Sequence, residues 1–211
     1  MPPAVATAEI AAQLASAGFE LPAPQIAALS EFLELLTRWN SVYNLTGIHK
    51  AAELIERHLV ESLALKSLLR GERVADVGTG AGLPGVPLAI AEPGRAFTLI
   101  ESRAKRVRFL RHVVGALALT NTTVAHSRAE HLLVDRPFDT VLARAVAPPA
   151  QLLEICRHLT APGSILLLLT ATHLQDEFRG LAPDFVLREV DSQRQGPRLR
   201  GSIVLLERID N

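Results

Sequence analysis

Hydrophobic residues recur at helical spacing in the first third of the chain and in short continuous runs after it. The early pattern predicts three helices, marked by Ile10 to Ala17, Ile26 to Trp39 and Leu54 to Leu68. The later runs predict strands at residues 73–77, 96–101, 122–126, 138–143 and 163–169. Helices are predicted at residues 84–91, 103–118, 148–159 and 173–180. Strands that alternate with helices indicate a parallel sheet covered on both faces.

The end of the chain follows a different pattern. Two apolar runs, residues 185–190 and 202–207, have no helical segment between them, and their linker contains Gly196, Pro197 and Gly201. This predicts a hairpin, with at least one antiparallel strand at the sheet edge. We therefore expect an α/β protein with a seven-stranded, mostly parallel sheet. A Rossmann-like domain would span residues 71–211, after an N-terminal helical extension over residues 1–70.

Composition sets limits on the class of protein. The chain has 211 residues, of which 48% are hydrophobic, enough for a sizeable core. Its single cysteine, Cys156, excludes an internal disulfide and fits a reducing compartment. The start has no basic leader, and the longest aliphatic run, residues 165–169, is too short to span a bilayer. A soluble, cytoplasmic protein is expected.

The net charge of zero hides an asymmetry along the chain. Residues 1–61 hold seven acids and three bases, whereas the remainder holds 19 bases and 15 acids, a net of +4. Nineteen of the 22 bases are arginine, the side chain best suited to forked contacts with phosphate. A GC-rich genome, which favours arginine codons, explains the same excess equally well.

Residues 74–85 carry the strongest signal for chemistry. Four glycines, at positions 78, 80, 82 and 85, follow Asp76 at the end of the first predicted strand. Glycine lets the backbone approach a ligand and adopt dihedrals that side chains forbid. Glu101 ends the next predicted strand, where an acid can hold both hydroxyls of a ribose. The pattern predicts a pocket for a nucleoside cofactor.

The identity of that cofactor has competing interpretations. Gly80, Gly82 and Gly85 also satisfy the spacing of a dinucleotide-binding turn. A carboxylate at Asp76 would repel a pyrophosphate, but it suits the ammonium group of S-adenosylmethionine. The terminal hairpin also favours a methyltransferase sheet. The plainest alternative is that the glycines serve only a tight turn.

A basic helix follows Glu101. Bases fill five of the nine positions from 103 to 111, namely Arg103, Lys105, Arg106, Arg108 and Arg111. Because the apolar stripe of this helix must face the core, most of these bases point outward. They form either an ordinary solvated face or a surface that tracks phosphates beside the pocket mouth.

In this order and spacing, the motifs resemble those of the bacterial small-subunit ribosomal RNA guanine-N7 methyltransferases, the family also called glucose-inhibited division protein B. The resemblance covers nearly the whole chain. It is carried by residues 39–40, 44–46, 57–62, 76–85, 105–110, 127–130 and 138–147. Two positions depart from the family pattern: Glu61 replaces a usual aspartate, and Thr170-Ala171 replaces a usual Lys-Gly.

The resemblance implies a class I S-adenosylmethionine-dependent enzyme that methylates N7 of a guanine in the decoding-centre loop of 16S rRNA. It implies cofactor contacts at positions matching Gly78, Leu83, Ala129, Glu130 and Arg144. Together with the glycine turn, the predicted cofactor residues are Asp76, Gly78, Gly80, Leu83, Glu101, Ala129, Glu130 and Arg144. Ala129 and Glu130 would flank the adenine, and Glu101 would hold the ribose.

Guanine N7 has an in-plane lone pair and no proton, so direct in-line transfer needs no general base. The chain lacks an Asn/Asp-Pro-Pro-Tyr/Phe motif after the fourth strand and has Arg144 there instead. Arg144 is predicted to contact guanine O6, a flanking phosphate or the cofactor; the alternative is a salt bridge to Asp139 or Glu130. Arg128 is the second catalytic candidate, through phosphate.

Other polar residues have more modest predicted roles. His58 is expected to serve in packing or capping. Trp39, Asn40, Tyr43 and Asn44 are expected to hold the N-terminal helices on the sheet, with a border to the guanine pocket at residues 44–46 as a second possibility. Only nine aromatic residues occur, which argues against a stacking platform for RNA.

The expected partner is 16S rRNA in the small ribosomal subunit. No membrane contact and no metal is expected, and a monomer is the default. Two rival functions are a catalytically idle RNA-binding or ribosome-assembly factor of the same fold and a nicotinamide-dependent oxidoreductase. The second would need a Tyr-x-x-x-Lys motif, and the only tyrosine, Tyr43, lies before the glycine turn.

Overall fold

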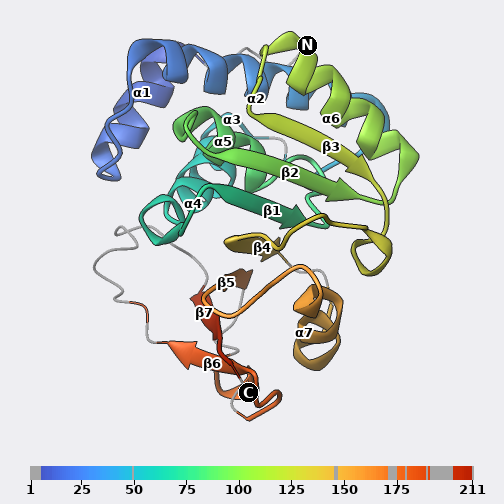
Figure 1. Cartoon of the computed structure of the whole chain (residues 1–211). Helices are drawn as coiled ribbons and strands as arrows, with labels where there is room; N and C mark the ends of the chain where they lie inside the picture. The colour runs from blue at the N-terminus through green and yellow to red at the C-terminus, as the bar shows by residue number, and fades with distance from the viewer. Residues whose placement is uncertain are drawn as a thin grey trace.

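A computed structural model describes residues 6–48, 50–144, 147–170, 175–178, 180–188, 190 and 202–210. Seven strands form one sheet in the order β3-β2-β1-β4-β5-β7-β6, running from top to bottom in Figure 1. The strands are β1 (Arg73–Val77), β2 (Ala96–Glu101), β3 (Thr122–His126), β4 (Thr140–Arg144), β5 (Ile165–Thr170), β6 (Phe185–Arg188) and β7 (Ser202–Arg208). The first five strands are parallel, and β7 runs antiparallel to both β5 and β6. The predicted seven-stranded α/β fold is confirmed.

Helices connect these strands and precede them. The α-helices are α1 (Thr7–Ser16), α2 (Ala23–Tyr43), α3 (Ala51–Leu54), α4 (Glu61–Leu63), α5 (Gly85–Ala91), α6 (Ala104–Ala116) and α7 (Pro149–Arg157). A π-helical segment η1 (Ile55–Val60) joins α3 to α4, and short 3₁₀ turns form η2 (Lys66–Leu68), η3 (Ala129–His131) and η4 (Gln175–Phe178). None of the described helices is both long enough and apolar enough to cross a membrane.

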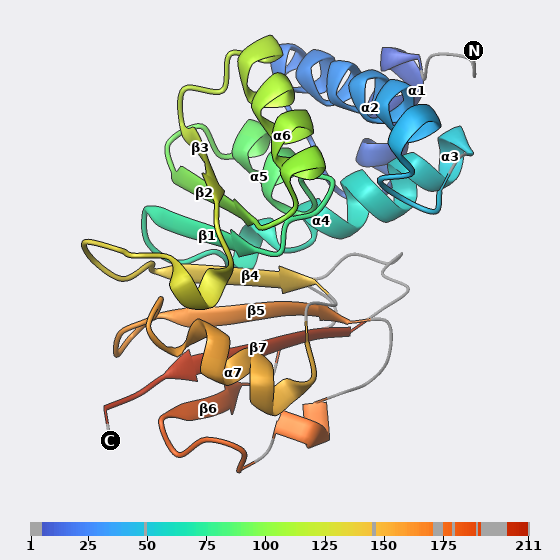
Figure 2. The ribbon, with the colours of Figure 1, turned by 90° about the vertical axis from the view of Figure 1, so that its right-hand side faces the viewer.

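Two layers of helix cover the sheet. The N-terminal helices share a core with α5 and α6, in which Leu33, Leu36, Val86, Leu110 and Val113 are buried. A second core lies between α7 and the opposite sheet face. Alternating residues of β1, β4 and β5 supply each face, as expected for strands buried on both sides. In Figure 2, α2, α5 and α6 lie together, and α7 lies near β5 and β7.

Two predicted helices differ from the structure, whereas the terminal strand pair agrees with the prediction. The expected helix from Leu54 to Leu68 is a succession of α, π, α and 3₁₀ segments. The terminal antiparallel pair with a strand at the sheet edge is confirmed: β7 pairs with β5 over residues 202–207 and lies inside the sheet, and β6 forms the edge. Of the expected helix at residues 173–180, residues 175–178 form a 3₁₀ turn. Residues 173, 174 and 179, and the linker glycines and proline of the hairpin, lie outside the described residues.

The register of the parallel strands gathers three polar side chains. Asp76 pairs with Leu99 of β2 and with Leu142 of β4. Because side chains alternate along a strand, Asp76, Glu101 and Arg144 project from the same face of the sheet. This is the face covered by α5, α6 and the N-terminal helices, so a site built there receives residues from both parts of the chain.

Candidate cofactor site

A cavity of about 680 Å³ opens where β1, β2 and β4 end. In parallel α/β sheets ligands bind at the carboxyl ends of the strands. The lining residues come from the loop after α2, from η1, from the turn after β1, from the β2–α6 junction and from β4. They are Leu45, Thr46, Gly47, Ile48, Arg57, His58, Gly78, Thr79, Gly80, Ala81, Leu83, Glu101, Ser102, Arg103, Arg106 and Arg144.

The floor of the cavity is the glycine turn. Gly78, Gly80 and Gly82 have φ values of 64°, 61° and 83°, a region that side chains rarely adopt. The amide of Thr79 donates to the carbonyl of Ile100, so the turn is attached to the end of β2. The backbone at Gly78 and Gly80 is thereby presented to the cavity without side chains between it and a ligand.

Asp76 braces this turn from beneath. Its Oδ2 accepts hydrogen bonds from the Thr79 hydroxyl at 2.6 Å and from the Gly85 amide at 2.8 Å, while its buried Oδ1 has no hydrogen-bond partner in the described part of the chain. Burial raises the pKa of the Asp76 carboxyl to about 7, against the opposing effect of the two hydrogen bonds. Asp76 is therefore a supporting residue of the cavity floor, and it is not among the residues that line it.

Glu101 presents a buried carboxylate at the end of β2. Its Oε1 accepts a hydrogen bond from the Arg103 amide at 2.8 Å, and its Oε2 lies 3.4 Å from Nη1 of Arg106. The first contact fixes the orientation of the carboxylate at the start of α6. The second oxygen is held only by a long contact to a flexible side chain, which leaves it suited to accept hydroxyl groups of a ligand.

Arg144 joins the sheet to the N-terminal helices. Its Nη2 lies 3.3 Å from Oε2 of Glu61, and its Nη1 donates to the carbonyl of Arg57 at 3.3 Å. Burial lowers the pKa of the Arg144 guanidinium, and Glu61 opposes this effect. A salt bridge to Asp139 or Glu130 was the alternative role predicted for Arg144 from the sequence, and both of these partners were wrong. Asp139 instead accepts from the amides of residues 72 and 73, and Glu130 lies 3.5 Å from Arg128.

One wall of the cavity comes from residues 45–48, between α2 and α3. Asn40 holds this loop, since its Oδ1 accepts from the Thr46 amide at 2.7 Å and its Nδ2 donates to the Ile48 carbonyl at 3.3 Å. His58 is also buried, with Nε2 3.3 Å from the Thr46 hydroxyl. Burial, followed by the charge of Arg144, lowers the pKa of His58 to about 4, so the imidazole is neutral at neutral pH.

The cavity brings together part of the predicted site. Gly78, Gly80, Leu83, Glu101 and Arg144 all line it, whereas Asp76, Arg128, Ala129 and Glu130 do not. The last three lie on η3 or immediately before it. That segment is next to the end of β2, because the Ser127 amide donates to the Glu101 carbonyl. Their contact with a cofactor stays a prediction.

Sequence reasoning missed most of the N-terminal wall. Gly47, Ile48 and Arg57 were not predicted to line a pocket, and His58 was expected only to pack or cap. Leu45 and Thr46 were the lesser of two interpretations, and the structure places both in the lining. The sequence signal that could have identified this wall is Asn40 followed closely by the motif at residues 44–46. A buried amide side chain needs a partner for both of its polar atoms, and a nearby loop can supply them.

The residues present fit S-adenosylmethionine. The glycine turn leaves room for a ligand against bare backbone, and the carboxylate of Glu101 has an oxygen available for ribose hydroxyls. Among the described residues, no three His, Cys, Asp or Glu side chains are grouped as a metal site requires. The strand order with an antiparallel β7, the glycine turn after β1 and the acid at the end of β2 define a class I S-adenosylmethionine-dependent methyltransferase.

The chain belongs to the rRNA small subunit methyltransferase G family, whose sequence profile matches residues 25–195. It is 40% identical over 188 residues to the ribosomal RNA small subunit methyltransferase G of Cronobacter sakazakii, covering 89% of this chain and 90% of the relative. The enzyme of the same name from Laribacter hongkongensis is 38% identical over 182 residues, covering 86% and 88%. The resemblance noted from the sequence motifs is thus confirmed.

Solved structures with lower sequence identity support the fold. A mutant of MtNAS in complex with S-adenosylmethionine aligns with a TM-score of 0.54 at 16% identity, covering 98% of this chain and 85% of the other. Precorrin-6y C5,15-methyltransferase from Geobacter metallireducens aligns with a TM-score of 0.53 at 13% identity, covering 80% and 92%. At these identities the similarity concerns the fold alone.

Proposed function

We propose that this protein is a 16S rRNA methyltransferase of the cytoplasm, which transfers a methyl group to N7 of a guanine in the decoding-centre loop. The observation that carries the proposal is the cavity that joins the glycine turn, Glu101 and Arg144. Relatives at about 40% identity are named ribosomal RNA small subunit methyltransferases. A catalytically idle RNA-binding factor is not favoured, because it would have no need to keep these cofactor residues together.

The cofactor-binding residues divide by the part of the ligand that they would meet. In this proposal Glu101 accepts hydrogen bonds from the ribose hydroxyls, as its buried position and available oxygen allow. Ala129 and Glu130 flank the adenine beside the end of β2. Gly78, Gly80 and Leu83 contact the amino-acid portion, and Asp76 supplies negative charge beneath it.

The reaction requires alignment rather than proton transfer. When bound, S-adenosylmethionine supplies a methyl group on a positively charged sulfur. As N7 of guanine forms its bond to carbon, the carbon–sulfur bond breaks, and no proton moves. Neutral His58 adds no positive charge beside the sulfonium, and Glu61 partly offsets the charge of Arg144. Holding the reacting atoms in line supplies several kcal/mol of rate acceleration.

Arg144 is the proposed contact to the base. Its guanidinium lines the cavity and is held in place by Glu61 and by the Arg57 carbonyl, so a free N–H can donate to guanine O6 or to a flanking phosphate. N7 must keep its lone pair for the methyl group and is therefore not the acceptor. Arg128 lies at the entrance to η3 and is exposed, which suits a phosphate contact.

Replacing Arg144 by lysine tests this role without leaving Glu61 buried and unpaired. We expect kcat/KM for rRNA to fall about 100-fold, because lysine keeps the charge but loses the planar fork that fixes the geometry. Arg188→Lys is the matched control, since that arginine lies on the edge strand β6 and pairs with Glu207 of β7. Equal activity of the two variants would remove Arg144 from the mechanism.

The function itself is tested with labelled S-adenosylmethionine and small ribosomal subunits from a strain that lacks the enzyme. The expected product is N7-methylguanine in 16S rRNA, identified by mass spectrometry of nuclease digests. A heat-inactivated sample controls for background. Label on another base or another atom would overturn the proposed substrate. If calorimetry detects no binding of the cofactor, a catalytically idle RNA-binding factor becomes the better interpretation.

The pH dependence of cofactor affinity follows from Asp76. In the free protein the pKa of this carboxyl is about 7, so below that pH it is mostly protonated. A cationic ligand favours the ionised form, so binding below pH 7 must release a proton. Affinity should therefore rise with pH through about 7 and be about tenfold weaker at pH ~5.5 than at pH ~8. Calorimetry at both pH values should show this dependence, and Asp76→Asn should flatten it.

A further inference from the structure

The outer face of α6 carries positive charge that nothing in the described part of the chain neutralises. Helix α6 contains no acid, and Arg103, Lys105, Arg108 and Arg111 are exposed. Within the described residues none of these four side chains forms an ion pair, whereas Arg106 lies 3.4 Å from Glu101. Surfaces that are merely solvated normally mix the two signs of charge. A one-sign strip of this kind attracts a polyanion.

An exposed aromatic ring lies at one end of this strip. Tyr43, the last residue of α2, is 42% exposed, and Lys105 Nζ lies 5.9 Å from the centre of its ring. The ring of Trp39 follows at 5.3 Å from that of Tyr43, and the ring of His112 lies 5.8 Å from that of Trp39. Helices α2 and α6 run side by side here, as Figures 1 and 2 both show. We call Tyr43 with Lys105 the Tyr43–Lys105 platform.

The platform is continuous with the mouth of the cofactor cavity. Tyr43 lies two positions before Leu45, which is the first residue of the cavity wall. Arg103, which also lines the cavity, is separated from Lys105 by one residue at the start of α6. A strand that leaves the cavity over Arg103 therefore meets the platform first and the remaining cations of α6 afterwards.

We infer that the Tyr43–Lys105 platform stacks an unpaired base next to the target guanine, while Arg108 and Arg111 bind the phosphates of the same strand. This inference rests on the proposed function and names the surface by which the rRNA is held. A flat ring beside a cation suits a base of any identity, because every base has a π-face. The scarcity of aromatics argued against stacking from the sequence; one exposed ring at the mouth of the site is enough for one base.

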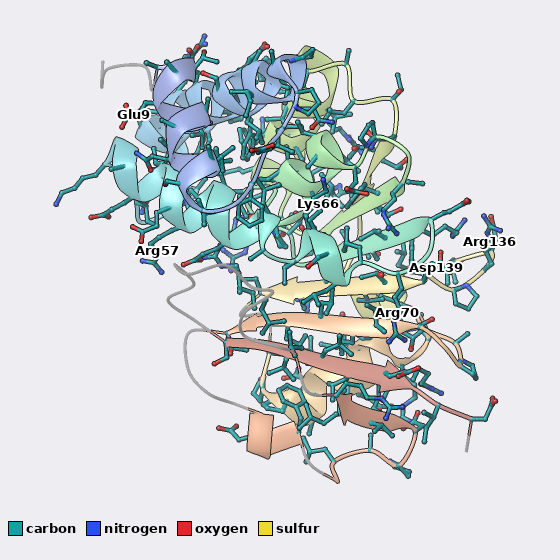
Figure 3. All side chains as sticks on the ribbon, turned by 90° about the vertical axis from the view of Figure 1, so that its left-hand side faces the viewer. Glu9, Arg57, Lys66, Arg70, Arg136 and Asp139 are labelled. Carbon is teal, nitrogen blue, oxygen red and sulfur yellow. The ribbon has the colours of Figure 1, made fainter. Side chains whose placement is uncertain are left out.

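The test uses the full-length protein and a 16S rRNA transcript, with affinity measured at several salt concentrations. Tyr43→Ala should weaken RNA binding about tenfold, and Tyr43→Phe should restore it, since stacking needs the ring and not the hydroxyl. Arg108→Glu should lower the slope of log affinity against log salt by about one. The matched control is Arg136→Glu, an exposed arginine at the opposite end of the sheet from Arg57 (Figure 3), which should leave that slope unchanged.

Two further readouts keep the outcome clear. Trp39 is the only tryptophan and stacks near Tyr43, so its emission should change when a short single-stranded RNA is titrated in. Affinity for S-adenosylhomocysteine should be the same in all variants. If Tyr43→Ala binds RNA as tightly as the parent, or if Arg108→Glu equals Arg136→Glu, the platform is overturned even when methyl transfer occurs. A different result would refute the proposed function alone: the variants lose RNA binding as expected, but the parent protein does not methylate N7.

Discussion

Replacement of Glu101 by alanine should abolish useful cofactor binding. We expect the affinity for S-adenosylhomocysteine to fall about 100-fold, because two charge-assisted hydrogen bonds to the ribose are worth about 3 kcal/mol together. The carboxylate is buried at the end of β2, where water cannot easily take its place. Glu101→Gln should lose about tenfold, since the amide oxygen can still accept from the Arg103 amide and the NH₂ group can donate to one ribose hydroxyl.

Calorimetry measures both variants, and Glu72→Ala serves as their control. Glu72 is an exposed acid just before β1, at the other end of the sheet, and its removal should leave the affinity unchanged. Thermal unfolding establishes that each variant is folded. An affinity of Glu101→Ala within about threefold of the parent would mean that the ribose is held elsewhere.

Gly85→Ala should strongly destabilise the protein. A methyl group at this position would lie 2.4 Å from Cδ2 of Leu99 and 2.6 Å from Oδ2 of Asp76. Asp76 cannot move aside without breaking its bonds to the Gly85 amide and to Thr79. Overpacking of this kind costs about 3 kcal/mol, which in a chain of this length lowers the melting temperature by about 10 °C.

Gly115→Ala is the matched comparison, because it makes the same change in the last turn of α6. No atom lies within 4 Å of the methyl group that it would add, so the helix should become slightly more stable, by about 0.5–1 kcal/mol. Scanning calorimetry of both variants tests the pair. Similar melting temperatures for the two variants would mean that the glycine turn accommodates the added methyl group without loss of stability.

The sheet was predictable because its strands are continuous apolar runs ended by polar or glycine-rich segments. The bounds of β1, β2 and β3 agree with the predicted ranges, and those of β4 and β5 shift by one or two residues. The shifts have a physical cause. The Phe138 amide donates to the carbonyl of Leu159, outside the sheet, and the Gly163 amide donates to the carbonyl of Arg208 at the end of β7, before the regular β5–β7 pairing begins at Ile165.

The N-terminal wall was harder to predict, because its contacts span long separations in sequence. Arg144 pairs with Glu61, a residue 83 positions earlier, and not with the acids nearer to it along the chain. Hydrophobic spacing is similar for α and π segments, so it did not mark η1, which carries Arg57 and His58. Asp76 was recognised as an acid beside the glycines, but its buried, bracing position depends on the fold around it.

The shared core of α2 and α6 has a consequence for synthesis of the chain on the ribosome. The rings of Trp39 and Phe109 pack 5.6 Å apart, so the part of α2 around Trp39 is covered only after α6 has been made. At about 5–20 residues per second, the interval between the two helices lasts on the order of ten seconds. During that time Trp39 lacks this partner, so the side of α2 that faces α6 reaches its final packing late in synthesis.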